Sequence, residues 1–83
     1  MYYVYVIRSV NFNRTYIGFT SNIENRLQQH NSGKTKSTKP FKPWTLVFFE
    51  EFESKDDAIN REKYLKSGVG REYVKRKLNQ IAS

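Results

Sequence analysis

Glu62 is the residue whose position carries the most chemical information. It falls on the apolar side of a helix predicted over residues 54–65, between Ala58 and Leu65 at spacings of four and three. An ionised carboxylate on an apolar stripe is costly unless it is paired or bound to a metal ion. Magnesium suits such a place, because it holds one or two protein carboxylates and keeps water for substrate phosphates. The alternative is a structural ion pair with Arg26, Arg61 or Lys66.

Four other side chains could act beside this carboxylate: Tyr5, Tyr16, Arg26 and His30. The two tyrosines are either core residues of strands or active-site hydroxyls. Arg26 either clamps a phosphate through its planar guanidinium, which lysine cannot reproduce, or is a solvated helix residue. His30 is the single histidine of the chain, and it could relay protons or orient a tyrosine hydroxyl.

Two strands are expected to position the tyrosines. Residues 2–8 are apolar or aromatic on both faces, which predicts a central strand covered on both sides. Residues 15–19 are a second β-rich run, and the turn residues between the two runs predict a hairpin with a longer loop. Pairing Arg8 with Thr15 would place Tyr5 diagonal to Tyr16 on one face.

A short helix should carry Arg26 and His30 one turn apart on a shared face. Ser21 and Glu24 have the spacing of a capping box, and the helix should end near residues 31–33. Residues 32–43 contain glycine, two prolines and four lysines, a composition that predicts a mobile basic loop and not a regular element.

The rest of the chain predicts one strand and two helices. The strand covers Trp44–Glu51, and the helix that follows is capped by Ser54 and ends before Gly68 and Gly70. The last helix should bury Val74, Leu78 and Ile81, and its other face carries Arg71, Lys75, Arg76 and Lys77. The order ββαβαα predicts an α+β fold, with a three-stranded antiparallel sheet flanked by helices.

Composition favours one small domain over residues 1–83 that binds a polyanion. Aromatic residues make up 16% of the 83 residues, so large rings must fill a small core. One histidine and no cysteine exclude a zinc site built from those residues. The net charge is +7, and two basic segments flank the acidic residues 44–60. The apolar start is too short for a membrane span, so we expect a soluble, cytoplasmic protein without membrane association.

Two short strings in the strands resemble the motif of a known family. Tyr16-Ile17-Gly18 is the second half of the motif that names the GIY-YIG nucleases, and Tyr3-Val4-Tyr5 stands where the first half should be. Arg26 in the next helix and Glu62 in a later one match the family's order over nearly the whole chain. The chain looks most like the small stand-alone members, which are related to the nuclease domain of the bacterial excinuclease.

The resemblance implies a function for each of these residues. Tyr5 and Tyr16 would lie side by side in a catalytic face, Glu62 would hold Mg²⁺ or Mn²⁺, and Arg26 would contact the scissile phosphate. His30 resembles the histidine that some restriction-enzyme members use near the tyrosine base. The implied reaction is hydrolysis of a phosphodiester bond in DNA, with a tyrosine as proton acceptor, in DNA repair or recombination.

Three positions depart from the family pattern. Tyr3 replaces the first glycine, Phe19 stands where many members have a small or basic residue, and the late metal-side asparagine has only Asn60 and Asn79 as candidates. A non-catalytic nucleic-acid-binding module or a partner-dependent nuclease subunit are therefore the alternatives to an endonuclease. Each would bind DNA without strong sequence specificity through one set of cations: Lys34, Lys36, Lys39, Lys42, Arg71 and Lys75.

Overall fold

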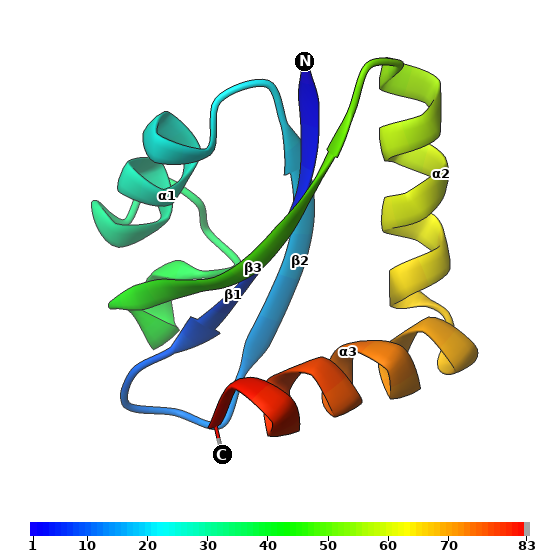
Figure 1. The fold of residues 1–83 in the computed structure, drawn as a ribbon. Coiled ribbons are helices and arrows are strands. Elements are labelled where there is room, and N and C mark those ends of the chain that lie inside the picture. Colours follow the sequence, from blue (N-terminus) through cyan, green and yellow to red (C-terminus); the bar gives the residue numbers. More distant parts are fainter. Residues whose placement is uncertain (83) are drawn as a thin grey trace.

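Three strands and three α-helices follow one another in the predicted order. A computed structural model describes residues 1–82 (Figure 1). The elements are β1 (Tyr2–Ser9), β2 (Thr15–Thr20), α1 (Ile23–Asn31), the short 3₁₀ helix η1 (Lys39–Phe41), β3 (Trp44–Phe52), α2 (Lys55–Lys66) and α3 (Gly68–Ala82). The α+β class and the order ββαβαα are confirmed, and η1 is an addition within the segment predicted to be a loop.

The sheet has the order β2-β1-β3, and both pairings are antiparallel. Arg8 pairs with Thr15, as predicted, and the same register places Tyr5 opposite Gly18. The central strand β1 is covered on both faces, with α1 on one side of the sheet and α2 and α3 on the other (Figure 1). Alternate residues of β1 therefore enter two separate cores.

The core beneath α2 and α3 is aliphatic. Val4 and Val6 of β1 pack there with Ala58 and Leu65 of α2 and with Val74 of α3. Phe19 of β2 also packs against this cluster. The residue that departs from the family pattern thus fills the core on the face opposite to that of Tyr5.

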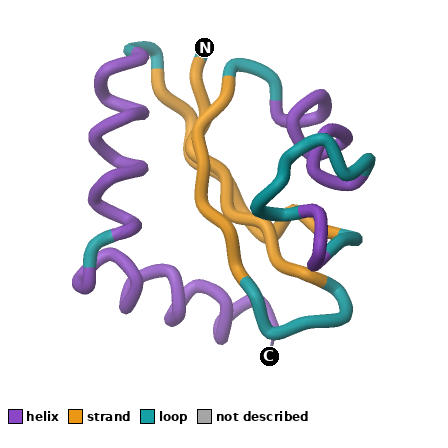
Figure 2. Tube along the Cα trace, turned by 180° about the vertical axis from the view of Figure 1, so that it is seen from behind, coloured by secondary structure: helices purple, strands orange, loops and turns teal. Residues whose placement is uncertain are grey.

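The core beneath α1 is built from larger and more polar side chains. Tyr5, Ile7 and Trp44 are its buried members, and Tyr16, Leu27, Phe41 and Leu46 pack around them. The segment that joins α1 to β3 lies on this side of the sheet (Figure 2). It is not the free loop that its composition predicts, because Thr38 is 1% exposed and Ser9 donates a hydrogen bond to the Phe41 carbonyl.

Two expected helix boundaries are wrong. Asn22, and not Ser21, caps α1, because its extended backbone lets its side chain accept a hydrogen bond from the Asn25 amide. The last helix begins at Gly68, so both glycines belong to it. Ile81 is also misplaced, since it is 55% exposed and the apolar contacts of α3 with the core end at Leu78.

One serine joins α2 to α3 and makes a close crossing possible. The Ser67 amide donates to the Tyr64 carbonyl at the end of α2, and the Ser67 hydroxyl accepts from the Gly70 amide at the start of α3. A Cβ atom on Gly70 would lie 1.9 Å from the Tyr64 carbonyl oxygen and 2.5 Å from the Leu65 Cα. Gly70 is therefore required by the approach of two backbones.

This crossing predicts opposite results for two nearby glycines. Gly70→Ala should lower the free energy of unfolding by about 1 to 3 kcal/mol, since rigid backbone atoms cannot make room for the methyl group. Gly68→Ala is the matched control, because nothing lies within 4 Å of its added Cβ, and its stability should be equal or slightly higher. Urea denaturation of both variants measures the difference. Equal stabilities would contradict the crossing.

Candidate active site

Two tyrosines meet on the α1 side of the sheet. Tyr5 comes from the centre of β1 and Tyr16 from the edge strand β2, diagonal to it, and their ring centroids are 6.3 Å apart. Tyr5 is only 2% exposed, whereas Tyr16 is half-buried. Of the two, Tyr16 presents the larger surface to a bound molecule.

Gly18 provides the space that the Tyr5 ring occupies. A Cβ atom at this position would lie 2.6 Å from the Tyr5 hydroxyl oxygen, 2.8 Å from its Cζ and 3.1 Å from Tyr16 Cε1. The glycine of the Tyr16-Ile17-Gly18 string is thus a steric requirement of the tyrosine pair. The sequence pattern identified the string but not this reason for it.

Helix α1 brings Arg26 and His30 to the Tyr5 hydroxyl. The hydroxyl is 2.9 Å from His30 Nε2, and Arg26 Nε donates to it at 3.4 Å. Arg26 Nη1 also donates to Gln29 Oε1 at 2.9 Å. The predicted one-turn spacing therefore directs both side chains to one atom, and it leaves other N–H groups of the guanidinium unused by these bonds.

Burial governs the protonation of this cluster. Burial raises the pKa of Tyr5, and the hydrogen bond from Arg26 offsets only part of that rise, to which Tyr16 and the Glu62 charge add. Burial also lowers the pKa of His30, and the positive charge of Arg26 lowers it further. At neutral pH the phenol is therefore protonated and the imidazole is neutral.

Glu62 interrupts the buried side of α2, as predicted, and its partner is the nearest lysine. Lys66 Nζ lies 3.3 Å from Glu62 Oε2, with the glutamate side chain 18% exposed and the lysine side chain 49% exposed. Arg61 pairs with Glu50 on β3 instead, at 2.7 Å, and Arg26 is engaged with Tyr5. Lys66 Nζ also lies 5.8 Å from the centroid of the Tyr16 ring.

A divalent ion would find one carboxylate here. No group of three or more histidine, aspartate or glutamate side chains that could hold a metal occurs within residues 1–82. That donor set does not suit an ion that needs a full protein cage, but it fits Mg²⁺ or Mn²⁺ with most ligands from water and substrate phosphate. Glu62 is the residue that would hold it, in competition with Lys66.

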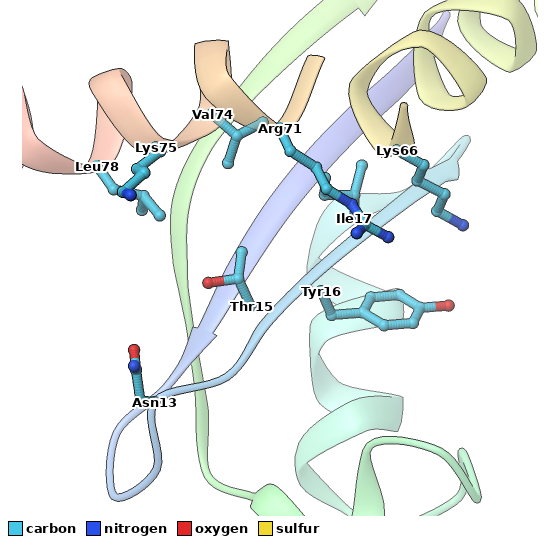
Figure 3. A pocket seen from close by; sticks show the side chains of 9 residues that line it. All are labelled: Asn13, Thr15, Tyr16, Ile17, Lys66, Arg71, Val74, Lys75 and Leu78. Carbon is cyan, nitrogen blue, oxygen red and sulfur yellow. The ribbon is translucent and has the colours of Figure 1, made fainter. Parts of the chain in front are cut away.

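A groove runs past Tyr16 at the free edge of the sheet. Its volume is about 490 Å³, and Figure 3 shows Lys66, Arg71 and Lys75 around it, with Ile17, Val74 and Leu78 as apolar lining. The sequence predicted Arg71 and Lys75 as binding residues. It named Lys66 only as a partner for Glu62 and missed its place in this groove.

The remaining predicted residues lie apart from the groove. Lys34, Lys36, Lys39 and Lys42 are all exposed on the segment that packs beside α1. Asn60 and Asn79, the two candidates for a late asparagine, are exposed and do not line the groove; Asn13 does. No helix among the described residues is long and apolar enough to cross a membrane.

Comparison with known proteins agrees with this fold and site. A family model described as the GIY-YIG catalytic domain matches residues 1–79. The chain therefore belongs to the GIY-YIG family, which is a family of nucleases, and its members act on nucleic acid.

Within that family the similar proteins are UPF0213 proteins. One from Staphylococcus haemolyticus is 42% identical over 67 residues, which cover 80% of this chain and 80% of that protein. Another, from Haloquadratum walsbyi, is 34% identical over 82 residues, which cover 98% of this chain and 85% of that protein. The solution NMR structure of a UPF0213 protein from Bacillus halodurans is 32% identical, has a TM-score of 0.53, and covers 89% of this chain and 82% of that one.

The buried neutral imidazole predicts a pH dependence of stability. His30 binds its proton at a lower pH in the folded chain than in the unfolded chain, so the unfolded state binds more protons as the pH falls below about 6.5. The free energy of unfolding should therefore fall with pH there, by at most about 1.4 kcal/mol per unit from this group. Chemical denaturation of wild type and His30→Gln between pH 7.5 and 5 measures it. The variant should lack this component, and an identical slope in both would contradict the assignment.

Proposed function

We propose that this chain is an endonuclease that hydrolyses phosphodiester bonds in DNA with one divalent ion, Mg²⁺ or Mn²⁺, bound by Glu62. The convergence of four elements at one edge of the sheet is the observation that carries the proposal. β1 and β2 supply the two tyrosines, α1 supplies Arg26 and His30, and α2 supplies Glu62, whose charge acts on Tyr5. A cytoplasmic role in DNA repair or recombination would suit this activity.

The ion, when bound, would stabilise charge on the phosphate and activate water. Arg26 is held by Tyr5 and Gln29, so its remaining N–H groups can bind a phosphate oxygen in a fixed orientation. Tyr16, half-buried beside the groove, would contact the substrate strand. The fixed cation and the positioned hydroxyls together favour the extra negative charge of the transition state.

The proton of the attacking water needs an acceptor, and a phenol with a raised pKa is a poor one by itself. Tyr5 can take that proton if its own proton passes at the same time to His30 Nε2, 2.9 Å away. The product is a neutral phenol and a buried imidazolium. The negative charge that develops on the nearby phosphate would favour this imidazolium.

Two groups of cations would hold the DNA strand on either side of this centre. The exposed lysines of the segment between α1 and β3 lie on the His30 side, while Lys66, Arg71 and Lys75 line the groove beside Tyr16. Such contacts with phosphates position a strand without reading its bases. We therefore propose DNA binding without strong sequence specificity.

A module that binds DNA without cleaving it is the second candidate. The Glu62 oxygen already has an ammonium partner in Lys66, which would weaken its hold on a divalent ion. A protein partner that supplies DNA or completes the site would reconcile both candidates. Cleavage by the purified chain decides between them.

Glu62→Gln tests the metal site. The variant should lose at least about 100-fold of the Mg²⁺-dependent cleavage of supercoiled, branched or single-stranded DNA. Its melting temperature in EDTA should change little, because the Lys66 ammonium is half exposed and stays hydrated. Glu53→Gln, an exposed carboxylate outside the site, is the control of equal charge. Full activity in Glu62→Gln, or none in wild type on any substrate, would contradict the proposal.

The salt dependence of binding tests the basic segment. Lys34→Ala with Lys36→Ala should reduce the slope of log affinity against log salt by roughly 0.9 for each phosphate that the two lysines neutralise on duplex DNA. Lys55→Ala with Lys63→Ala removes the same charge from exposed positions of α2 and should alter the slope less. Fluorescence anisotropy from 50 to 300 mM salt measures both. Equal slopes for the two double variants would remove the segment from the interface.

A further inference from the structure

A line of hydrogen bonds extends from the Tyr5 hydroxyl into the segment between α1 and β3. The hydroxyl oxygen lies 2.9 Å from His30 Nε2, and His30 Nδ1 lies 2.8 Å from Thr38 Oγ1. Thr38 Oγ1 in turn donates to the Thr35 carbonyl oxygen at 3.3 Å. Tyr5, His30 and Thr38 are all buried, so each bond must satisfy a group that has little access to water.

The direction of these bonds follows from the atoms at the two ends. A carbonyl oxygen only accepts, so the single hydroxyl proton of Thr38 points to Thr35, and Thr38 Oγ1 must accept from His30 Nδ1–H. At the other end the Arg26 Nε–H donates to the Tyr5 oxygen, which leaves the Tyr5 proton for His30 Nε2. Both ends require the proton of the neutral imidazole to be on Nδ1.

We propose that Thr38 is a positioning residue that holds His30 in the Nδ1–H tautomer, so that Nε2 is free to accept the Tyr5 hydroxyl proton. The bond made by one ring nitrogen decides which nitrogen of a neutral imidazole is protonated. With the opposite tautomer, Nε2–H would donate to the Tyr5 oxygen, and the ring could accept nothing from Tyr5. The Thr38 hydroxyl therefore fixes the direction of proton transfer at a residue that it does not touch.

The backbone around Thr38 is built to keep that hydroxyl in place. The Thr38 carbonyl accepts hydrogen bonds from Trp44 Nε1 at 2.9 Å and from the Phe41 amide at 3.1 Å. Trp44 is held through both its amide and its carbonyl by the Asn31 side chain at the end of α1. A hydroxyl fixed by contacts to α1, η1 and β3 has little freedom to release the imidazole.

The tautomer can be read directly, because the chain has one histidine. Protein labelled with ¹⁵N histidine should show, in long-range ¹⁵N–¹H correlation spectra near pH 7.5, a protonated Nδ1 and an unprotonated Nε2. Thr38→Val replaces the hydroxyl with a methyl group and should move the proton to Nε2 in all or most molecules. Thr38→Ser keeps a hydroxyl and should restore the wild-type pattern. A protonated Nε2 in wild type, or an unchanged pattern in Thr38→Val, would overturn the proposal.

Two further variants separate Thr38 from its neighbours. Thr35→Val leaves the Thr35 carbonyl in place, so it should keep the wild-type tautomer and control for a valine in this segment. Tyr5→Phe removes the partner of Nε2, and the proton should remain on Nδ1 because Thr38 is intact. If Thr38→Val does not fold, Tyr5→Phe still decides, since a proton on Nε2 in that variant would show that Tyr5 sets the tautomer.

The consequence for cleavage rests on the proposed function, whereas the tautomer does not. In a cleaving enzyme, Thr38→Val should lower kcat by about 10- to 100-fold with little change in KM, and Thr38→Ser should recover most of it. If wild type cleaves nothing, the nuclease proposal fails while the spectra still test the tautomer. If wild type cleaves and Thr38→Val shows the proton on Nε2 with unaltered kcat, Thr38 has no positioning function in the reaction.

Discussion

The close contact of Tyr5 with Gly18 across β1 and β2 is the constraint on which the site depends. Only a residue without a Cβ leaves room for the Tyr5 ring, and only one register of the hairpin puts that residue opposite Tyr5. A slip of one residue would turn Tyr5 into the aliphatic core, where Val4 and Val6 hold α2 and α3 to the sheet. On its own face Tyr5 buries a hydroxyl that must be paired, and its partners come from α1. The register therefore fixes the contents of both cores at once.

Charge is distributed so that anions approach the groove side of the sheet. Lys66, Arg71 and Lys75 surround the groove beside Tyr16, and the carboxylate near them, Glu62, is already neutralised by Lys66. A site of this kind has weak affinity for a free divalent ion, because it offers one carboxylate and a competing cation. The phosphate of a bound substrate would supply the negative charge that is lacking, so ion and substrate would bind together.

The sequence by itself determined the strands, their order and the placement of Arg26 and His30 on one face of α1. These features follow from periods of two and 3.6 residues and from short-range spacing, so a local stretch of chain is enough to predict them. The same periodicity predicted Glu62 on the buried side of α2. Local pattern was misleading where two caps competed, as with Ser21 and Asn22.

Tertiary structure alone decided how the side chains combine. The composition of residues 32–43 predicts a loop, yet Thr38 is buried there because Trp44, six residues later, and His30 on α1 satisfy its polar atoms. The choice of Lys66 as the partner of Glu62 and the need for glycine at position 70 likewise depend on where helices end and cross. Such contacts join segments that no local period relates, so their energies exist only after the elements have packed.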